Sequence, residues 1–426
     1  MTEGIVHVVG AGLAGLSAAV RLAEAGRRVV LHEAAKQAGG RCRSYFDATL
    51  GLEIDNGNHL LLSGNRSALG YAELTGGTEA LQTAEDARFD FADVRTGERW
   101  QLQPNAGRLP WWIFVPSRRV PGSRATDYLA PFRLLGAKPE TRIGDAMACS
   151  GALYDRLWKP VLLSALNTEV PDASARLAGT IIRETLGAGG EACRPVVATG
   201  GLSAAFVDPA LAWLRRHGAE IRFGERLRAI HVTGGAVERL AFASGEITLG
   251  RDDRIVVALP PWVAADLLPG IQGPDEYRGI LNAHFRILPP PGQPLLLGMV
   301  GSVSEWLFAY PDRLSVTVSA ADRLFDTDRE ELARTIWREI AQVTGLSAEL
   351  PPWQIVKEKR ATFASTPAQD ARRPATSGAY PNLVLAGDWT QTGLPATIEG
   401  AIRSGENAAR VLHRGDIGVS RFVSKA

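Results

Sequence analysis

Residues 5–33 read IVHVVGAGLAGLSAAVRLAEAGRRVVLHE, and this stretch decides the fold of the first part of the chain. The apolar run 5–9 predicts a buried strand, residues 16–25 predict a helix that ends at Gly26, and residues 29–31 predict a return strand. A strand, a glycine-rich turn, a helix and a second strand form a βαβ unit of the kind that binds a dinucleotide.

Three glycines and one acidic residue indicate how this unit would hold its ligand. Gly10 permits the tight turn, Gly12 lets a pyrophosphate approach the backbone, and Gly15 allows close packing of the helix on the strand. The phosphates would then lie at a helix amino terminus, where free N–H groups and the helix dipole favour negative charge. Glu33, at the end of the return strand, is placed to accept hydrogen bonds from a ribose diol and disfavours a 2′-phosphate.

Composition excludes several classes of protein. The chain has 426 residues, enough for two or more domains, and its net charge of +1 gives no electrostatic basis for binding nucleic acid. Its three cysteines, Cys42, Cys149 and Cys193, are scattered without metal-ligand spacing, which fits a reducing compartment and excludes a disulfide framework. Residues 1–4 do not resemble a secretory signal, and no apolar run is long enough to span a membrane. We therefore expect a cytoplasmic protein without a metal site.

The pattern of strands along the chain predicts two interleaved domains. Strands of the parallel, buried type return at residues 255–259 and 383–386, and a Gly234-Gly235 turn predicts a hairpin between 227–232 and 237–242. A helix is predicted over 202–217 and another over 329–344. The nucleotide domain is predicted from residues 1–70, 195–261 and 375–415, the second domain from 71–194 and 262–374, and a tail from 416–426.

The last strand opens a second candidate ligand site. Residues 386–401 read AGDWTQTGLPATIEGA, which predicts a tight turn at Gly387-Asp388 and a helix that begins near Ala396. Two helix amino termini that face one crevice suit FAD, with the pyrophosphate at one helix and the flavin N1–O2 edge at the other. With the glycine-rich unit and Gly39-Gly40-Arg41, this set of motifs resembles the flavin amine oxidase and phytoene desaturase superfamily. The resemblance implies an α/β fold: a Rossmann-like FAD-binding domain of the amine-oxidase type interleaved with an α+β substrate domain.

Within that superfamily the chain looks most like the hydroxysqualene dehydroxylases of bacterial squalene and hopanoid biosynthesis. The stretches that carry this closer likeness are DNGNHLLLSG at 55–64, LNTEVPDASA at 166–175 and KRATFASTPAQ at 359–369. The resemblance implies an apolar isoprenoid substrate, hydroxysqualene, and upstream enzymes of the squalene pathway as possible partners. We interpret the reaction as loss of water to give an allylic cation, followed by hydride transfer from reduced FAD.

The same resemblance assigns residues to the parts of FAD. It places Gly10, Gly12, Leu13, Ala14 and Gly15 at the pyrophosphate, with Glu33 and Ala34 at the adenosine ribose. It places the backbone of Leu227 at the adenine, Gly40 and Arg41 along the pyrophosphate and ribityl chain, and Gly387 and Asp388 at the ribityl side. Thr397 and Ile398 would offer N–H groups to the flavin O2, and the loop of Gly57, Asn58 and His59 would lie near the flavin. No cysteine occupies a family attachment position, so we expect non-covalent FAD.

The identity of the proton donor stays open at this stage. His59 is the first candidate, because histidine transfers protons near neutral pH, although it could simply bond to backbone or FAD. Asp55 is the second candidate, but an aspartate before Asn56-Gly57 is commonly a turn former. We expect Arg360, Trp389 and Leu394 to line the substrate pocket.

Residues 109–116, LPWWIFVP, hold more consecutive large apolar side chains than one strand can bury. Trp111, Trp112 and Phe114 could contact a membrane interface on the inner face, helped by nearby arginines such as Arg118, or they could form core or tunnel wall. Other redox enzymes of the superfamily, namely a carotenoid or phytoene desaturase and an amine oxidase, remain alternatives to a dehydroxylase. A flavin-dependent isomerase and a lipid-presenting accessory protein are further ones.

Overall fold

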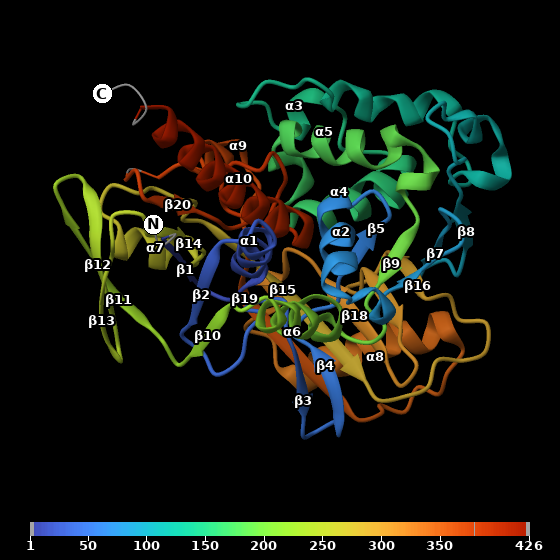
Figure 1. Ribbon diagram of the computed structural model, residues 1–426. Coiled ribbons are helices and arrows are strands. Elements are labelled where there is room, and N and C mark those ends of the chain that lie inside the picture. The colour runs from blue at the N-terminus through green and yellow to red at the C-terminus, as the bar shows by residue number, and fades with distance from the viewer. Residues whose placement is uncertain (1–3, 379, 423–426) are drawn as a thin grey trace.

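The computed structural model of the chain describes residues 4–378 and 380–422. Its central element is a five-stranded parallel sheet in the order β10-β2-β1-β14-β20 (Figure 1). Three separated stretches of sequence supply the strands: β1 (Ile5–Val9), β2 (Arg28–Glu33), β10 (Glu220–Phe223), β14 (Arg254–Val257) and β20 (Leu383–Leu385). The loops after β1 and β20 therefore open at the same, carboxyl edge of one sheet.

Helices cover one face of this sheet. Val6 and Val8 of β1 point into an apolar core shared with α1 (Leu13–Glu24), α6 (Asp208–Arg216) and α10 (Ile398–Phe422). The helices α1 and α10 cross closely, because a Cβ at Gly405 would lie 2.3 Å from the carbonyl oxygen of Ala14. Helix α2 (Arg66–Thr75) packs on the same core.

A small antiparallel sheet and a short helix cover the other face. This sheet contains β11 (Leu227–Thr233), β12 (Ala236–Phe242) and β13 (Gly245–Thr248), and the helix is α7 (Pro261–Leu267). Their apolar side chains pack against Val9 of β1 and Val257 of β14. The alternation of side chains along β1 thus buries both faces of the parallel sheet.

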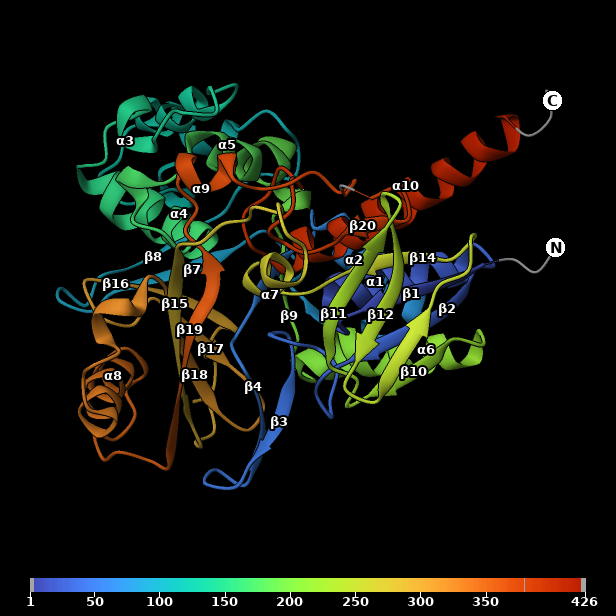
Figure 2. The same cartoon turned by 90° about the vertical axis from the view of Figure 1, so that its left-hand side faces the viewer.

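A seven-stranded mixed sheet forms the second lobe (Figure 2). Its order is β19-β15-β18-β17-β16-β7-β8, so both long insertions contribute strands. The strands are β7 (Phe89–Asp93), β8 (Arg99–Leu102), β15 (Tyr277–Phe285), β16 (Leu296–Val300), β17 (Trp306–Ala309), β18 (Leu314–Val318) and β19 (Trp353–Phe363). Helix α8 (Arg329–Thr344) packs on its apolar face.

Shorter elements join these two sheets and cap the second lobe. The hairpin of β3 (Ser44–Asp47) and β4 (Leu52–Asp55) lies between the lobes in Figure 2. A three-stranded sheet consists of β5 (Leu60–Leu62), β9 (Pro195–Val197) and β6 (Gln82–Thr83). The helical cap contains α3 (Ile143–Ala146), α4 (Lys159–Leu166) and α5 (Ala175–Glu184), and it shares an apolar core with side chains of the seven-stranded sheet. Helix α9 (Pro367–Ala371) lies beside the cap in Figure 2.

The α/β fold predicted from the sequence is confirmed, and α8 has the predicted bounds. The helix predicted over 202–217 instead contains a π-helical turn, Ser203–Val207, before α6, where Pro209 lacks the N–H that a regular α-helical turn requires. The strand predicted over 255–259 ends at Val257. Helix α1 begins at Leu13, three residues earlier than predicted, because Gly12 occupies its N-cap.

The predicted domain limits stay a prediction, but three of them fall inside helices. The limit at residue 70 lies within α2, and the limit at residue 261 lies within α7. The tail predicted from residue 416 is helical as far as Phe422, with 423–426 outside the described residues. Within the described part of the chain, no helix is long and apolar enough to cross a membrane.

Candidate active site

The turn after β1 has the geometry of a phosphate cradle. Gly10 has a φ of +105°, and a Cβ at Gly15 would lie 1.8 Å from the carbonyl oxygen of Gly10, so both positions require glycine. A Cβ at Gly12 would meet no atom of the described residues within 4 Å, so the space above it is open. Gly12 is also the N-cap of α1, and no side chain caps that helix. The helix amino terminus is therefore available to an anion.

Gly39 and Gly40 form the opposite wall of this cradle. Gly39 forms a parallel bridge with Gly12, and a Cβ at Gly40 would lie 3.5 Å from the Cα of Gly12. Glu33 accepts hydrogen bonds of 2.8 Å from the N–H groups of Ala11 and Ala35, one on each carboxylate oxygen. Ala34, between Glu33 and Ala35 in the sequence, is half-exposed. Each oxygen can accept a second bond, so the carboxylate still fits a ribose diol.

The last loop of the chain meets this cradle. The Arg41 guanidinium donates to both carboxylate oxygens of Asp388, at 2.8 and 2.7 Å, and also bonds to the carbonyl oxygen of Ala361. At Gly387, the backbone N–H donates to the hydroxyl of Ser404 in α10. Thr397 caps α10 by accepting from the N–H of Gly400 at 3.0 Å, which explains why the helix begins at Ile398 and not near Ala396. Loops from the two ends of the chain thus meet beside the phosphate cradle.

The predicted position of Arg41 along the pyrophosphate and ribityl chain stays a prediction. In the structure its guanidinium pairs with Asp388, and the side chain also contacts strand β19. The ion pair joins the first loop, the last loop and the second lobe.

The loop of Gly57, Asn58 and His59 is fixed by the seven-stranded sheet. The Asn58 N–H donates to the Oδ1 of Asn282 in β15 at 3.1 Å, and its side-chain amide bonds to Thr317 in β18 and to Tyr310. The side-chain amide of Asn58, which the resemblance places near the flavin, therefore bonds to residues of the second lobe. Sequence reasoning missed these three partners, because a polar residue within an apolar strand carries no sign of what it will contact.

The charges of Asp55 and Arg41 both act on His59, and they shift its pKa in opposite directions. Its Nδ1 is 2.9 Å from the carbonyl oxygen of Gly57, so Nδ1 carries the hydrogen and Nε2 is the remaining acceptor of the neutral ring. Burial lowers the pKa of His59 below its ordinary value, although the Gly57 carbonyl and Asp55 oppose that shift. The ring is therefore mostly neutral near pH 7, and it is a strong acid once protonated.

Asp55 has a structural part. Its Oδ1 accepts from the hydroxyl of Ser44 at 2.6 Å and from the N–H of Leu202, at the start of the helical segment that leads into α6. Its Oδ2 is buried and has no hydrogen-bond partner among the described residues, and burial raises the pKa of this carboxyl. The second candidate acid thus serves first as a cap for a distant helix.

Over residues 13–413 the sequence matches the family described as flavin containing amine oxidoreductase. The chain belongs to this family. Among curated relatives, the hydroxysqualene dehydroxylases of Rhodopseudomonas palustris and Sinorhizobium fredii are 56% and 52% identical, each over 95% of this chain and 97% of theirs. A probable zeta-carotene desaturase of Synechococcus elongatus is 21% identical over 96% of this chain and 98% of its own.

Solved structures of the family share the fold. A putrescine oxidase double mutant superposes with a TM-score of 0.70 at 16% identity and covers 96% of this chain and 99% of its own. Cyclohexylamine oxidase from Brevibacterium oxydans also gives 0.70 at 16% identity, over 97% of this chain and 100% of its own. The predicted resemblance is confirmed: the chain is an FAD-dependent oxidoreductase of the flavin-containing amine oxidoreductase family.

The crevice fits the cofactor of the family. The open space above Gly12, the uncapped start of α1 and the capacity of Glu33 for further hydrogen bonds suit a pyrophosphate and a ribose. The resemblance places the flavin end at Asp388, Thr397 and Ile398 and the adenine at Leu227, and these placements stay predictions. Strand β11 begins at Leu227, just after the N–H of Glu225 bonds to the carbonyl oxygen of Glu33. Flavin cofactors of this kind transfer hydride.

The residues predicted to line the substrate pocket or to contact a membrane lie in different surroundings, and their pocket-lining part stays a prediction. Trp112 is buried in the cap core and meets Tyr128 edge to face at 5.1 Å, which agrees with the core alternative for this residue. Trp389 is 2% exposed, and its indole N–H donates to the carbonyl oxygen of Leu259 at 3.0 Å, beneath the parallel sheet. Leu394 is buried, and the Arg360 guanidinium stacks over the ring of Trp262 at 4.6 Å.

The three cysteines are free, and the described ranges contain no group of three His, Cys, Asp or Glu side chains that could hold a metal ion.

Proposed function

We propose that this chain reduces hydroxysqualene to squalene. The observation that carries the proposal is 47–56% identity over 95% of the chain to three hydroxysqualene dehydroxylases. The intact phosphate cradle supports it. In the proposed reaction the carbon–oxygen bond breaks, the hydroxyl group leaves as water after taking up a proton, and a carbon–hydrogen bond forms. When bound, reduced FAD supplies the hydride and hence both electrons.

The protein's own part is to supply the proton and to hold the crevice in shape. We assign the proton to Nε2 of His59, because Nδ1 is held by the Gly57 carbonyl and the lowered pKa makes the protonated ring a ready donor. The ion pair of Arg41 and Asp388 joins the first and last loops of the chain, and its two charges neutralise each other. Asn282 keeps the His59 loop in place through Asn58.

Product analysis tests the reaction. The purified holoprotein is incubated anaerobically with hydroxysqualene and a chemical flavin reductant, and the hydrocarbon is analysed by mass. Loss of one oxygen atom supports the proposal. Loss of hydrogens would indicate a desaturase, an unchanged mass with a new isomer would indicate an isomerase, and no change at all would favour an accessory protein.

The His59→Gln variant should retain its flavin but lose at least about 100-fold in kcat, the lower end of what a positioned general acid contributes. In the unmodified protein kcat should rise as the pH falls toward the lowered pKa of His59, because only the protonated ring donates. This rise should be missing in the variant. The measurement is kcat against pH, with His231→Gln on β11 as the control; an unchanged profile in His59→Gln would exclude this residue as the acid.

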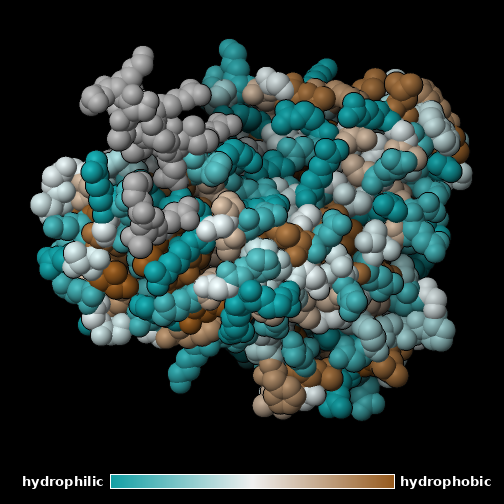
Figure 3. Space-filling view, viewed as in Figure 1, coloured by the Kyte–Doolittle hydropathy of each residue, from teal (hydrophilic) through white to brown (hydrophobic). Residues whose placement is uncertain are grey.

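We further propose that the protein works in the cytoplasm, attached peripherally to the inner face of the membrane, near the enzymes that make its substrate. The support is a cluster of exposed apolar side chains in residues 109–135, named here the apolar edge. Trp111 and Phe114, from the 3-10 turn Trp111–Phe114, are 51% and 72% exposed. Further exposed members are Leu109, Leu129, Phe132 and Leu135. Apolar side chains gather at the upper right of Figure 3, over the cap of Figure 1 to which this segment belongs.

Charge at the apolar edge suits an anionic lipid surface. The guanidinium of Arg118 lies 4.9 Å from the centre of the Trp111 ring, and Arg124 and Arg133 are exposed in the same segment. Aromatic side chains at the headgroup level with arginines around them are typical of proteins that bind membrane interfaces.

The double variant Trp111→Ser/Phe114→Ser should bind vesicles of anionic lipid at least about tenfold more weakly, because two exposed rings no longer enter the interface. Vesicle co-sedimentation measures the binding. The neighbouring Trp112→Phe change, in the buried core, is the control for damage to the cap and should leave binding intact. Equal partitioning of the double variant and the parent protein would contradict the membrane proposal.

A further inference from the structure

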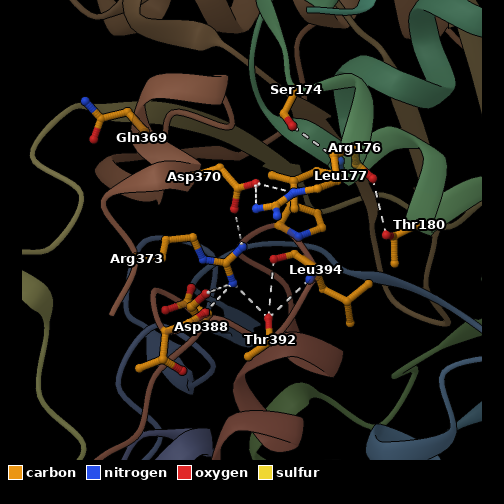
Figure 4. Close-up of polar contacts among 12 residues, drawn as sticks. Ser174, Arg176, Leu177, Thr180, Gln369, Asp370, Arg373, Asp388, Thr392 and Leu394 are labelled. Atoms are coloured by element: carbon orange, nitrogen blue, oxygen red, sulfur yellow. Dashed lines mark hydrogen bonds and ion pairs between the residues drawn. The ribbon is translucent and has the colours of Figure 1, made fainter. Parts of the chain in front are cut away.

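Arg373 lies buried behind the loop that joins β20 to α10. Its side chain is only 1% exposed. One terminal nitrogen donates to the carbonyl oxygens of Asp388, at 3.1 Å, and Thr390, and to the hydroxyl of Thr392 at 2.8 Å. Figure 4 shows the guanidinium between this loop and Asp370. One side chain thus holds three acceptors of the loop that carries the predicted flavin contacts.

The other terminal nitrogen is anchored outside that loop. It donates to Asp370 Oδ1 at 3.0 Å, and Asp370, itself 3% exposed, accepts on Oδ2 from Nε of Arg176 at 3.1 Å. Arg176 belongs to α5 of the helical cap, and Asp370 belongs to α9, whose first turn is capped by the Thr366 hydroxyl. A series of contacts therefore runs from the helical cap, through Asp370 and Arg373, to the loop from Asp388 to Thr392, named here the flavin loop (Figure 4).

Stability alone does not account for this arrangement. A buried guanidinium loses much of its hydration, and one carboxylate is shared here by two arginines, so a well-packed apolar side chain could serve the fold as well. Nε of Arg373 is buried and has no hydrogen-bond partner among the described residues. What an apolar side chain could not do is fix the carbonyls of Asp388 and Thr390 in one orientation.

Asp388 is consequently held from two sides. Its carboxylate binds the half-exposed Arg41, and its carbonyl binds the buried Arg373. We propose that Arg373 is a positioning residue for FAD: it presets the loop from Asp388 to Thr392, and with it the start of α10, in the arrangement that receives the flavin. The inference rests on the family's cofactor and is independent of the substrate.

FAD affinity tests the proposal. The full-length holoprotein is dialysed against decreasing FAD concentrations, and the retained flavin gives the Kd. Arg373→Gln should weaken FAD binding at least tenfold, and Arg373→Lys should give a smaller loss, because an ammonium group cannot reproduce the planar fork. The matched control is Arg372→Gln: this neighbour is exposed, and its bonds go to Asp275, at 2.9 Å, and to the carbonyl oxygen of Gly273 rather than to the acceptors that Arg373 holds, so its Kd should stay within twofold.

A second pair of variants covers the case in which Arg373→Gln does not fold. Thr392→Val removes one acceptor of Arg373 but keeps its ion pair with Asp370, and it should weaken FAD binding severalfold, whereas Thr392→Ser keeps the hydroxyl and should not. The melting temperature is followed over a range of FAD concentrations in parallel. If Arg373 only stabilised the fold, both Arg373→Gln and Thr392→Val would melt at lower temperatures and keep the parent Kd for FAD. That result would overturn the proposal.

Discussion

Replacing Gly12 by valine is expected to yield a folded protein that has lost its flavin. Gly12 has a φ of −72°, which every L-residue adopts, and a Cβ there meets none of the described atoms within 4 Å. The fold therefore has room for the new side chain. That room is the space where the pyrophosphate must approach the backbone at the start of α1, so the valine methyl groups exclude the phosphates. We expect FAD to bind at least about 100-fold more weakly, because its doubly charged pyrophosphate can no longer contact the amino terminus of α1.

The measurement combines visible flavin absorbance with circular dichroism. Gly12→Val should be colourless with an unchanged far-UV spectrum. Gly15→Ala should instead disturb the fold itself and change the far-UV spectrum, because its Cβ would lie 1.8 Å from the carbonyl oxygen of Gly10 and must displace backbone. Gly70→Val in α2, where a Cβ also meets nothing within 4 Å, is the matched control and should stay yellow. Full flavin content in Gly12→Val would refute the phosphate assignment.

The local parts of this fold could be predicted because their causes are local. The βαβ unit depends on the order of an apolar run, three glycines and a helix, and all of these are adjacent in sequence. Helix α8 has its predicted bounds because Asp328 caps its first turn and Gly345, with a φ of +74°, ends it. The last strand and helix were predicted in place but not in their bounds, because α10 begins at Ile398 and continues through the predicted tail as far as Phe422.

The long-range parts could not be predicted in this way. Trp112 and Trp111 are neighbours in one apolar run, yet one is buried and the other is half exposed, because a 3-10 turn sends them in different directions. The partners of Asn58 come from strands more than 200 residues away. Arg373 stands beside Arg372 in the sequence, and only the packing of α9 against the flavin loop separates the buried arginine from the exposed one.

A buried histidine in the second lobe sets up the other large effect. His284 of β15 is 0% exposed, and its Nδ1 lies 2.8 Å from the hydroxyl of Ser315 on the adjacent strand β18. Burial, aided by the positive charge of Arg313, lowers the pKa of His284 to about 3. The folded protein therefore keeps this ring neutral through the mildly acidic range, while the unfolded chain takes up a proton below about pH 6.5.

Acid should consequently destabilise the protein in a way that His284→Asn relieves. Because the unfolded state binds the extra proton, stability falls as the pH drops from about 6.5 toward 3, by about 1.4 kcal/mol per pH unit for this one histidine. Urea unfolding of the FAD-saturated protein at pH 6.5 and 4.5 should show a loss that is about 2 kcal/mol smaller in His284→Asn than in the parent, because the unfolded histidine is already about half protonated at pH 6.5. The variant can be less stable at pH 7 through lost packing, so the difference between the two pH values is the quantity compared. Parallel pH dependence in His284→Asn and the parent would show that His284 does not titrate on unfolding.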